Sequence, residues 1–351
     1  MVHREMAEFG HDQVTYALED DVGLRAIVAI HDTTLGPALG GTRLLPYETE
    51  DEALQDVLRL SRAMTYKAAA AELDLGGGKA VIVAEPDAKD EATMRAYGRI
   101  VDRLDGQYVT SVDVNTTVAD MDVVAEETDH VVGTSDGLGD PSPVTARGVV
   151  AGIRACVEAT YGSDGLDDRT VLVQGLGKVG SRLAKRLLEA GAAVKVSDVD
   201  PAAVASFTDG RDVEAVAHGD VYDEPCDVFA PCAVGGVVDD ETIPRLECDV
   251  VAGAANNVLA ERRHAEALRE RGILYAPDYV INAGGLITVA TEYAGDTRAD
   301  ALEAADRIGD RLLALIERAD GRGTTVLDAA DAYARERIET ATEPTPSPAE
   351  T

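Results

Sequence analysis

Tryptophan is absent from this sequence of 351 residues, phenylalanine occurs three times, and cysteine occurs four times. The cysteines form no CxxC pair and have no zinc-finger spacing, so we expect them to be small buried apolar residues. The six histidines are scattered, and none belongs to an HExxH motif. The sequence therefore predicts neither a disulfide framework nor a bound metal.

Lysine is also rare, since only six of the 32 basic residues are lysines, whereas 65 residues are acidic. The formal net charge of −33 repels polyanions, so nucleic acid and anionic membranes are poor partners. Such an acid excess is typical of a protein adapted to very high salt, where screening makes self-repulsion tolerable. In this chain a single acidic residue is weak evidence for a site, and a lysine is strong evidence.

Long hydrophobic runs are missing as well. The longest uncharged run, Tyr279–Thr291, has 13 residues, whereas a membrane helix needs about 20. The N-terminus has no apolar signal core, so we expect a cytoplasmic protein. A hydrophobic content of 45% supplies a core, and the length suits two domains.

The order of apolar segments predicts an α/β fold. Residues 14–19, 24–31, 80–84 and 108–112 are typical of strands, and residues 50–70, 91–104, 118–127 and 144–161 of helices. Six short apolar runs follow, at 171–174, 193–197, 213–216, 227–230, 249–252 and 273–276. Because helical or loop segments separate these runs, they predict a parallel, doubly wound sheet. Residues 280–339 are mostly helical in pattern, and the Pro-, Thr- and Glu-rich end predicts a disordered tail.

A glycine-rich turn lies between the first of these six strands and a helix that begins at Ser181. Gly175 permits a tight turn, Gly177 lets backbone amides approach a pyrophosphate, and Gly180 lets the helix pack closely. Asp198 ends the next strand, where a carboxylate binds the adenosine ribose and repels a 2′-phosphate. We therefore expect NAD rather than NADP as cofactor. The cofactor-binding segment comprises Gly175, Leu176, Gly177, Lys178, Val179, Gly180 and Ser181, together with Asp198.

A second group of residues carries the candidate chemistry. Lys67 and Lys79 lie 12 residues apart, the latter after three glycines that permit close approach of a ligand to the backbone. The segment is not a phosphate-binding Walker A loop, because Leu73 and Ala80 replace its first glycine and its Ser/Thr. A desolvated lysine beside another cation has a depressed pKa and can act as a base. Asp113 ends an apolar strand, from which its side chain can enter a cleft.

The segment around Ser135 also fits G-x-S-x-G, the nucleophile elbow of hydrolases. That motif requires a helix directly after the serine. Glycines and prolines follow Ser135 instead, so we do not expect a hydrolase.

Taken together, these segments resemble the glutamate/leucine/phenylalanine/valine dehydrogenase family, and most closely its leucine dehydrogenase branch. The resemblance rests on PALGGTR (37–43), MTYKAAAAELDLGGGKAVI (64–82), DVNTTVADMDVVAEET (113–128), PSPVTARGV (141–149), VQGLGKVG (173–180), CDVFAPCAVGG (226–236), VVAGAANNVLAE (250–261) and YAPDYVINAGGLITVATEY (275–293).

The resemblance implies roles for individual residues. Lys67 would bind the α-carboxylate of an amino acid, and Lys79 would be the general base that activates water. Asp113 would move protons to and from the substrate nitrogen. Gly40 and Gly41 would bring their backbone against the substrate.

The resemblance also implies where the cofactor and the domains lie. Thr145 and Asn257 would hold the nicotinamide carboxamide, Asn257 would also reach the substrate, and Asn282 would lie at the interdomain cleft. The expected organisation is a mixed-sheet substrate domain (1–143), a Rossmann NAD domain (144–285), C-terminal helices returning to the first domain (286–338) and a disordered tail (339–351). Family members are homo-oligomers.

The substrate follows from what lines the expected pocket. Glutamate-specific members of the family place a lysine where this chain has Leu39, and a buried unpaired carboxylate is costly, so an apolar side chain is favoured. The other expected wall residues are Met64, Ser111, Leu286 and Val289. The implied reaction is reversible NAD-dependent oxidative deamination of an apolar L-amino acid of the leucine, valine or isoleucine type.

Two alternatives within the family remain. Val112 and Asn115 depart from the leucine dehydrogenase pattern, and Asn115 and Arg147 are closer to glutamate-type sequences, so glutamate dehydrogenase stays open. Phenylalanine dehydrogenase stays open because Ser111 and Leu286 are larger than the residues of many leucine-type enzymes. A third alternative, from another class, is a catalytically silent NAD-binding regulatory protein, against which the presence of Lys67, Lys79 and Asp113 argues.

Overall fold

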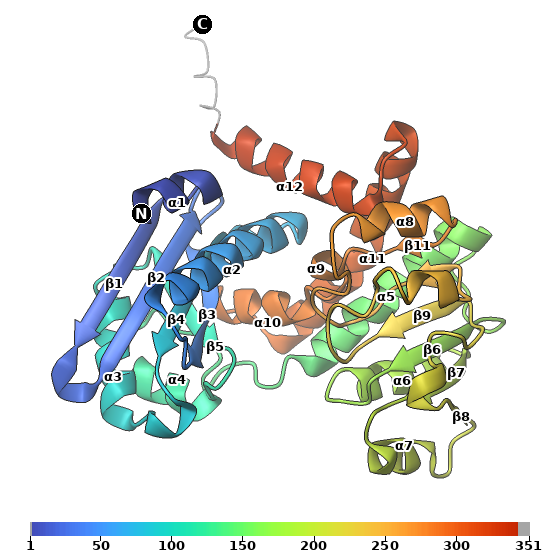
Figure 1. The fold of residues 1–351 in the computed structure, drawn as a ribbon, viewed down its shortest axis with the longest axis horizontal. Coiled ribbons are helices and arrows are strands. Elements are labelled where there is room, and N and C mark those ends of the chain that lie inside the picture. Colours follow the sequence, from blue (N-terminus) through green and yellow to red (C-terminus); the bar gives the residue numbers. More distant parts are fainter. Residues whose placement is uncertain (1, 343–351) are drawn as a thin grey trace, which may run out of the picture. The chain divides into compact units, whose positions relative to one another are not determined.

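The computed structural model describes residues 2–342 (Figure 1). They form two compact units. Of the described residues, the first unit comprises those through Gly139, the segment Val289–Asp296 and those from Tyr333 to Thr342. The second comprises Asp140–Thr288 and Thr297–Ala332.

The first unit is built on a five-stranded mixed sheet. Its strands lie in the order β1-β2-β4-β3-β5. Strand β2 pairs antiparallel with β1 and β4, whereas β3 pairs parallel with β4 and β5. The bounds are β1 (Gln13–Glu19), β2 (Leu24–Asp32), β3 (Ala38–Leu45), β4 (Gly76–Val83) and β5 (Tyr108–Val112).

Helices cover both faces of this sheet. Helix α2 (Glu50–Ala70) packs against β2 and β4, and its buried residues form one core with Ile27, Ala29 and Val81. The opposite face forms a second core with α3 (Glu91–Asp102) and α4 (Val118–Ala125). The Thr49 hydroxyl accepts the Glu52 amide and begins α2, whose acidic first turn complements the helix dipole. The predicted bounds of α2 are confirmed.

Three elements of the first unit differ from the predictions. Helix α1 (Val2–Phe9) and strand β3 were not expected, because Gly40-Gly41 in β3 interrupts the apolar pattern of a strand. The glycines 76–78, expected as a loop before a strand, are the first three residues of β4.

The second unit is built on a six-stranded sheet in which every pair is parallel, which confirms the doubly wound prediction. The strands lie in the order β11-β10-β9-β6-β7-β8. Their bounds are β6 (Thr170–Gln174), β7 (Ala193–Ser197), β8 (Glu214–Ala215), β9 (Val228–Pro231), β10 (Val250–Val251) and β11 (Leu274–Tyr275). The helices between them are α6 (Gly180–Glu189), α7 (Pro201–Thr208) and α8 (His264–Glu270), and α5 (Ser142–Tyr161) precedes the sheet.

From Asp278 to Thr342 the chain is mainly helical, with α9 (Asp278–Ile281), α10 (Gly284–Tyr293), α11 (Arg298–Arg322) and α12 (Val326–Thr342). The expectation that all these helices return to the first domain is wrong for α11, which packs along α5 within the second unit (Figure 1). Glycines permit this close packing, since a Cβ on Gly148 would lie 2.5 Å from Ile308 and one on Gly309 2.9 Å from the Ala151 carbonyl oxygen.

Of the described residues after Thr288, the segment Val289–Asp296 and residues 333–342 belong to the first unit, where Arg337 donates to the Leu73 carbonyl at 2.8 Å. Residues 339–342 of the expected disordered tail are helical because α12 continues to Thr342. Residues 343–351 lie outside the described range. Short 3-10 turns complete the fold at η1 (Asp20–Val22), η2 (Pro86–Ala88), η3 (His218–Asp220) and η4 (Ile243–Arg245). Between residues 2 and 342, no helix is long and apolar enough to cross a membrane.

Candidate active site

The α2 face of the first sheet collects the candidate catalytic side chains. A Cβ on Gly77 would meet the Thr65 amide of α2 at 2.1 Å, so Gly77 faces this helix. Because side chains alternate along a strand, Lys79 points to the same face. The register supports this, since Lys79 lies opposite Ala29, which belongs to the α2-side core.

Lys79 and Asp113 form an ion pair between the Lys79 Nζ and the Asp113 Oδ2. Lys79 is only 7% exposed. Burial lowers the pKa of its ammonium, although the Asp113 carboxylate opposes this shift. The pair therefore holds a lysine whose neutral form is more accessible than that of a lysine in water, next to an acceptor for its proton.

Lys67 and Met64 come from the helix that covers this face. They lie three residues apart in α2, hence on the same flank, and both are half-buried. The helix is fixed to the sheet beside them, because Thr65 is buried and its hydroxyl oxygen shares a hydrogen bond with His31 Nδ1 at 2.8 Å. The substrate role of Lys67 remains a prediction.

The glycines of this region are required by the protein's own packing. Cβ atoms on Gly76 and Gly78 would lie 2.1 Å from the Asp32 carbonyl oxygen and 2.6 Å from the Tyr108 ring. The interpretation that the triple glycine serves ligand approach is therefore unnecessary. Gly40 is equally crowded, by the Gly78 carbonyl at 1.7 Å. Gly41 faces Asp113, since a Cβ on Gly41 would lie 2.9 Å from the Asp113 Cβ.

Leu39 and Ser111, two expected pocket walls, are both buried. Ser111 lies opposite Gly41 in the β3–β5 register, and its hydroxyl would lie 2.9 Å from a Cβ on Gly133. The loop that contains Gly133 is held by Glu292, whose carboxylate accepts the backbone amides of Gly133 and Leu138 at 2.6 and 2.9 Å. Glu292 thus shapes the backbone beside Ser111, a role that the sequence did not reveal.

A further ion pair reaches the Lys79–Asp113 pair from β3. Arg43 Nε lies 3.6 Å from Asp113 Oδ2, and Arg43 Nη1 donates to Asp56 Oδ2 at 3.0 Å. Tyr47 donates to the same Asp56 oxygen at 2.7 Å. Sequence reasoning missed Arg43, although it lies two residues after Gly41 and would have been placed on the same face had strand β3 been expected.

In the second unit, the glycine turn has the predicted position between β6 and α6. Gly175 has φ = +100°, and a Cβ on Gly180 would lie 1.9 Å from the Gly175 carbonyl oxygen, so both glycines are required by the turn itself. A Cβ on Gly177 would meet nothing within 4 Å among the described atoms. Gly177 therefore faces open space, as a ligand-approach glycine should.

Asp198 lies beside this turn. Its carboxylate accepts the Leu176 amide at 2.6 Å and the Asp200 amide at 2.8 Å. The first turn of α6, which lies wholly within the described residues, contains no acidic residue, and no side chain caps its amides. Its N-terminal amides are thus free of competing side-chain carboxylates, which suits an anion.

The other expected cofactor residues lie elsewhere in the second unit. Thr145, near the start of α5, is buried and lies close to Gly284. A Cβ added to Gly284 would lie 2.5 Å from the Thr145 Cα. Asn257 has φ = +51°, and Asp278 accepts its amide. Asn282 donates to the Asn256 side chain at 2.8 Å, so it supports this loop from within. Leu286 is buried in the second unit, whereas Val289 is half-buried in the first.

Two residues that kept glutamate dehydrogenase open have structural explanations. Arg147 forms a two-point ion pair with Asp306 of α11, so its charge is engaged within the second unit. Asn115 has φ = +60°, a conformation that asparagine tolerates well, and its amide donates to the Leu44 carbonyl at 3.0 Å. Neither residue therefore argues for an acidic substrate.

As predicted from the sequence, Ser135 does not lie in a nucleophile elbow. It lies in an irregular loop where its amide donates to Asp122, and the next helix, α5, starts only at Ser142.

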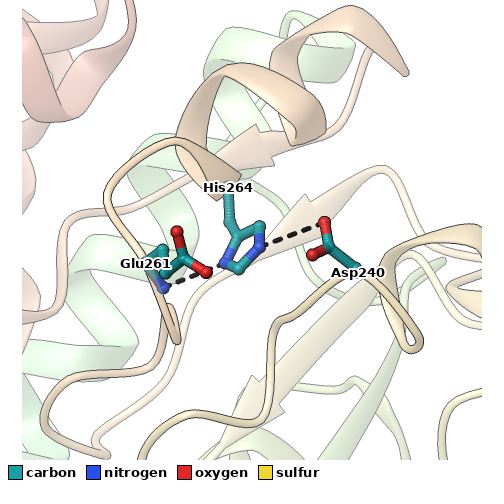
Figure 2. A group of neighbouring side chains, drawn as sticks. All are labelled: Asp240, Glu261 and His264. Atoms are coloured by element: carbon teal, nitrogen blue, oxygen red, sulfur yellow. Dashed lines mark hydrogen bonds and ion pairs between the residues drawn. The ribbon is translucent and has the colours of Figure 1, made fainter.

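One group of side chains resembles a metal site, and Figure 2 shows His264 between Glu261 and Asp240. His264 Nδ1 accepts the Glu261 amide at 3.0 Å, and Nε2 faces Asp240 Oδ1 at 3.4 Å. Arg263 donates to both carboxylates. Its hydrogen bonds lower the pKa of Asp240 to about 2. The arrangement is thus explained by an arginine that neutralises two acids and a histidine that caps a turn.

A mixed-sheet unit with a buried lysine–aspartate pair, followed by a parallel-sheet unit with a dinucleotide-type glycine turn, defines an amino acid dehydrogenase. Comparison with known proteins gives the family. Residues 11–130 match the model "Glu/Leu/Phe/Val dehydrogenase, dimerisation domain", and residues 199–343 match "Glutamate/Leucine/Phenylalanine/Valine dehydrogenase".

Individual relatives agree. The chain is 48% identical to leucine dehydrogenase of Geobacillus stearothermophilus over 95% of its own length and 92% of that protein. It is 46% identical to phenylalanine dehydrogenase of Caldalkalibacillus thermarum over 94% and 91%. The crystal structure of L-tryptophan dehydrogenase from Nostoc punctiforme superposes with a TM-score of 0.90 at 44% identity, covering 98% of this chain and 100% of that one. The chain belongs to the Glu/Leu/Phe/Val dehydrogenase family, whose members depend on NAD(P).

Proposed function

We propose that this enzyme catalyses the reversible, NAD-dependent oxidative deamination of an apolar L-amino acid, with leucine, valine and isoleucine as the preferred class. The observation that carries the proposal is the buried Lys79 ammonium paired with Asp113 on the α2 face of the first sheet. Burying a lysine–carboxylate pair is costly, and groups with pKa values perturbed by burial and a charge partner cluster at functional sites.

The reaction assigns a proton to each of these residues. One amino acid, one NAD⁺ and one water give a 2-oxo acid, ammonium, NADH and a proton. The cofactor supplies the hydride acceptor. After the α-carbon has lost its hydride, Lys79 takes a proton from water, whose oxygen adds to the iminium carbon. Asp113, which takes a proton from the substrate ammonium before the hydride is lost, returns that proton to the amino nitrogen. Ammonia leaves as the carbonyl forms. The hydroxyl proton and the proton held by Lys79 are then released, one to ammonia to give ammonium and one to solvent.

The apolar substrate class is supported by Leu39 and by the engagement of Arg147. Leu39 is 1% exposed and offers a side-chain carboxylate no partner. Arg147, the cation considered for such a partner, is bound to Asp306. Binding glutamate would bury a carboxylate beside a hydrocarbon wall, which is unfavourable by several kcal/mol. The relatives act on leucine, phenylalanine and tryptophan according to their names, which is consistent with an apolar pocket.

The second unit supports NAD as the cofactor. Gly177 has room that no described protein atom fills, and the amides at the start of α6 are uncapped by side chains. Asp198 lies beside the glycine turn, where a carboxylate favours a ribose hydroxyl and repels a 2′-phosphate. Thr145 and Asn257 would hold the nicotinamide carboxamide.

We also infer that the enzyme is a homo-oligomer. Strand β1 is an edge strand, and its Tyr16 and Leu18 side chains are 43% and 63% exposed. Exposed apolar side chains on an unpaired edge favour pairing with another chain.

The test is the amino-acid-dependent formation of NADH, followed by absorbance in molar KCl because of the acidic composition. We expect turnover with leucine, valine and isoleucine, less with phenylalanine, and the least with glutamate. Lys79→Ala and Asp113→Asn should each lower kcat at least about 10²-fold, the usual contribution of a positioned acid or base.

Lys89→Ala is the matched control, because Lys89 is another lysine of the first unit paired with an aspartate, Asp120. It should retain normal turnover. Circular dichroism checks that each variant is folded. Near-wild-type kcat in Lys79→Ala, or no activity of the wild type with any of these amino acids, would contradict the proposal.

A further inference from the structure

A second cation faces the catalytic carboxylate. Arg43 Nε is buried and has no hydrogen-bond partner among the described residues, and it lies 3.6 Å from Asp113 Oδ2, the oxygen that pairs with Lys79. A buried donor without a partner is costly, so its direction toward Asp113 calls for an explanation. Strand β3 directs Arg43 toward Asp113, because every second residue of a strand points to the same face and Leu39, Gly41 and Arg43 therefore share one face of β3.

Arg43 is held in this position from behind. Its Nη1 donates to Asp56 of α2, and Asp56 also accepts from Tyr47 and from Arg59. Burial raises the pKa of Asp56, but these hydrogen bonds and the arginine charges outweigh it, so the pKa lies below its ordinary value. Asp56 is therefore an ionised anchor. The Arg43 side chain is 20% exposed, and its guanidinium spans two carboxylates.

The position of Arg43 matters for Lys79 because a single facing carboxylate stabilises the ammonium form. A general base must give up that proton before it can act. Arginine stays charged at all relevant pH values, so Arg43 offsets the negative charge of Asp113 permanently. The charged side chains that shift the pKa of Lys79 include Asp113, Arg43 and Asp56. Burial is the main cause of its lowered pKa, Asp113 opposes this, Arg43 lowers the pKa further, and Asp56 has a smaller opposing effect.

We propose that Arg43 is a positioning residue for the Lys79–Asp113 pair: anchored by Asp56, it holds the Asp113 carboxylate in place and offsets its charge at Lys79. This inference rests on the proposed function, in which Lys79 is the base. It predicts that Arg43 sets the pH at which the enzyme becomes active, whereas a structural arginine would change stability alone.

The test is the pH profile of kcat/KM for the amino acid in the wild type, Arg43→Gln and Arg43→Lys. In Arg43→Gln the loss of positive charge raises the pKa of Lys79. The acidic limb should therefore move to higher pH by roughly half to one unit, with kcat/KM near neutrality falling about three- to tenfold. Arg43→Lys keeps the charge but lacks Nε, so its limb should stay close to that of the wild type while kcat falls.

Arg59→Gln is the matched control, since it removes another guanidinium from the same Asp56 but is not paired with Asp113. Its profile should coincide with that of the wild type. An acidic limb of active Arg43→Gln that coincides with the wild type would overturn the inference. If Arg43→Gln does not fold, Arg43→Lys decides: an unchanged limb with lowered kcat supports the inference, and wild-type kcat overturns it. An inactive wild type contradicts the proposed function instead, so the two failures are distinguishable.

Discussion

The histidine pair beneath helix α1 makes the stability of the first unit depend on pH. His11 and His31 are both buried, with ring centroids 4.9 Å apart. Their ring nitrogens bind the hydroxyls of Ser61 and Thr65 of α2, at 2.7 and 2.8 Å. Burial, followed by repulsion from His31, lowers the pKa of His11 from 6.5 to about 4. Burial also lowers the pKa of His31.

The sign of the effect follows from linkage. Because the pKa of His11 is lower in the folded state, the unfolded chain binds more protons between pH 6.5 and about 4. The free energy of unfolding must therefore fall as the pH falls through this window. At 1.36 kcal/mol per pKa unit, the full effect of His11 is about 3 kcal/mol, of which about 2 kcal/mol is lost between pH 7.5 and pH 5.

The assay is urea unfolding in molar KCl at pH 7.5 and pH 5. His11→Gln keeps an amide near Ser61 but cannot titrate, so it should lose about 2 kcal/mol less than the wild type over this interval. Ser61→Ala is the control, since it removes a hydrogen-bond partner and leaves the histidine. It should lower the free energy at both pH values while keeping the difference between them. Equal losses in the wild type and His11→Gln would refute the reasoning.

Three further substitutions test the glycines and Asp198. Gly78→Ala should destabilise the first unit by about 1–3 kcal/mol in urea unfolding, because its Cβ would lie 2.6 Å from the Tyr108 ring; a change below about 0.5 kcal/mol would contradict the packing. Gly177→Ala should leave unfolding nearly unchanged, since nothing described lies within 4 Å, but should raise the KM for NAD about tenfold if a pyrophosphate approaches there. Asp198→Ser should lower kcat/KM for NAD and raise it for NADP, measured as the ratio of the two, and an unchanged ratio would exclude Asp198 as the determinant.

Much of the fold was accessible from periodicity. Helix α2 has apolar residues at helical spacing, and the six strands of the second unit coincide with short apolar runs, so their positions follow from the sequence pattern. Strand β3 was not accessible in this way. Its Gly40 and Gly41 have no side chain to show an alternation. Glycine is required at these positions because Gly78, Val112 and Asp113 approach too closely for a Cβ. That cause lies in residues about 40 and 70 positions away, which local pattern reasoning does not include.

The candidate site also contains residues that the sequence pattern indicated and residues that it did not. Lys79 and Asp113 were recognisable because lysine is rare in this chain and because Asp113 ends a strand. Arg43 was not, since its approach to Asp113 depends on the parallel pairing of β3 with β5, in which Gly41 lies opposite Ser111. Glu292 was equally hidden, because it binds the loop at Gly133 from 159 positions along the chain.

The glycines and Lys79 are therefore parts of one arrangement. Gly77 lets Thr65 of α2 approach the sheet, and Gly41 lets Asp113 approach it from the neighbouring strand. A larger residue at either position would push α2 or Asp113 away from the strand that carries Lys79. Water would then reach a side chain that is now 7% exposed. Burial is the main cause of the lowered pKa of Lys79. The glycines at positions 41 and 77, which permit this burial, therefore help to determine the basicity of Lys79.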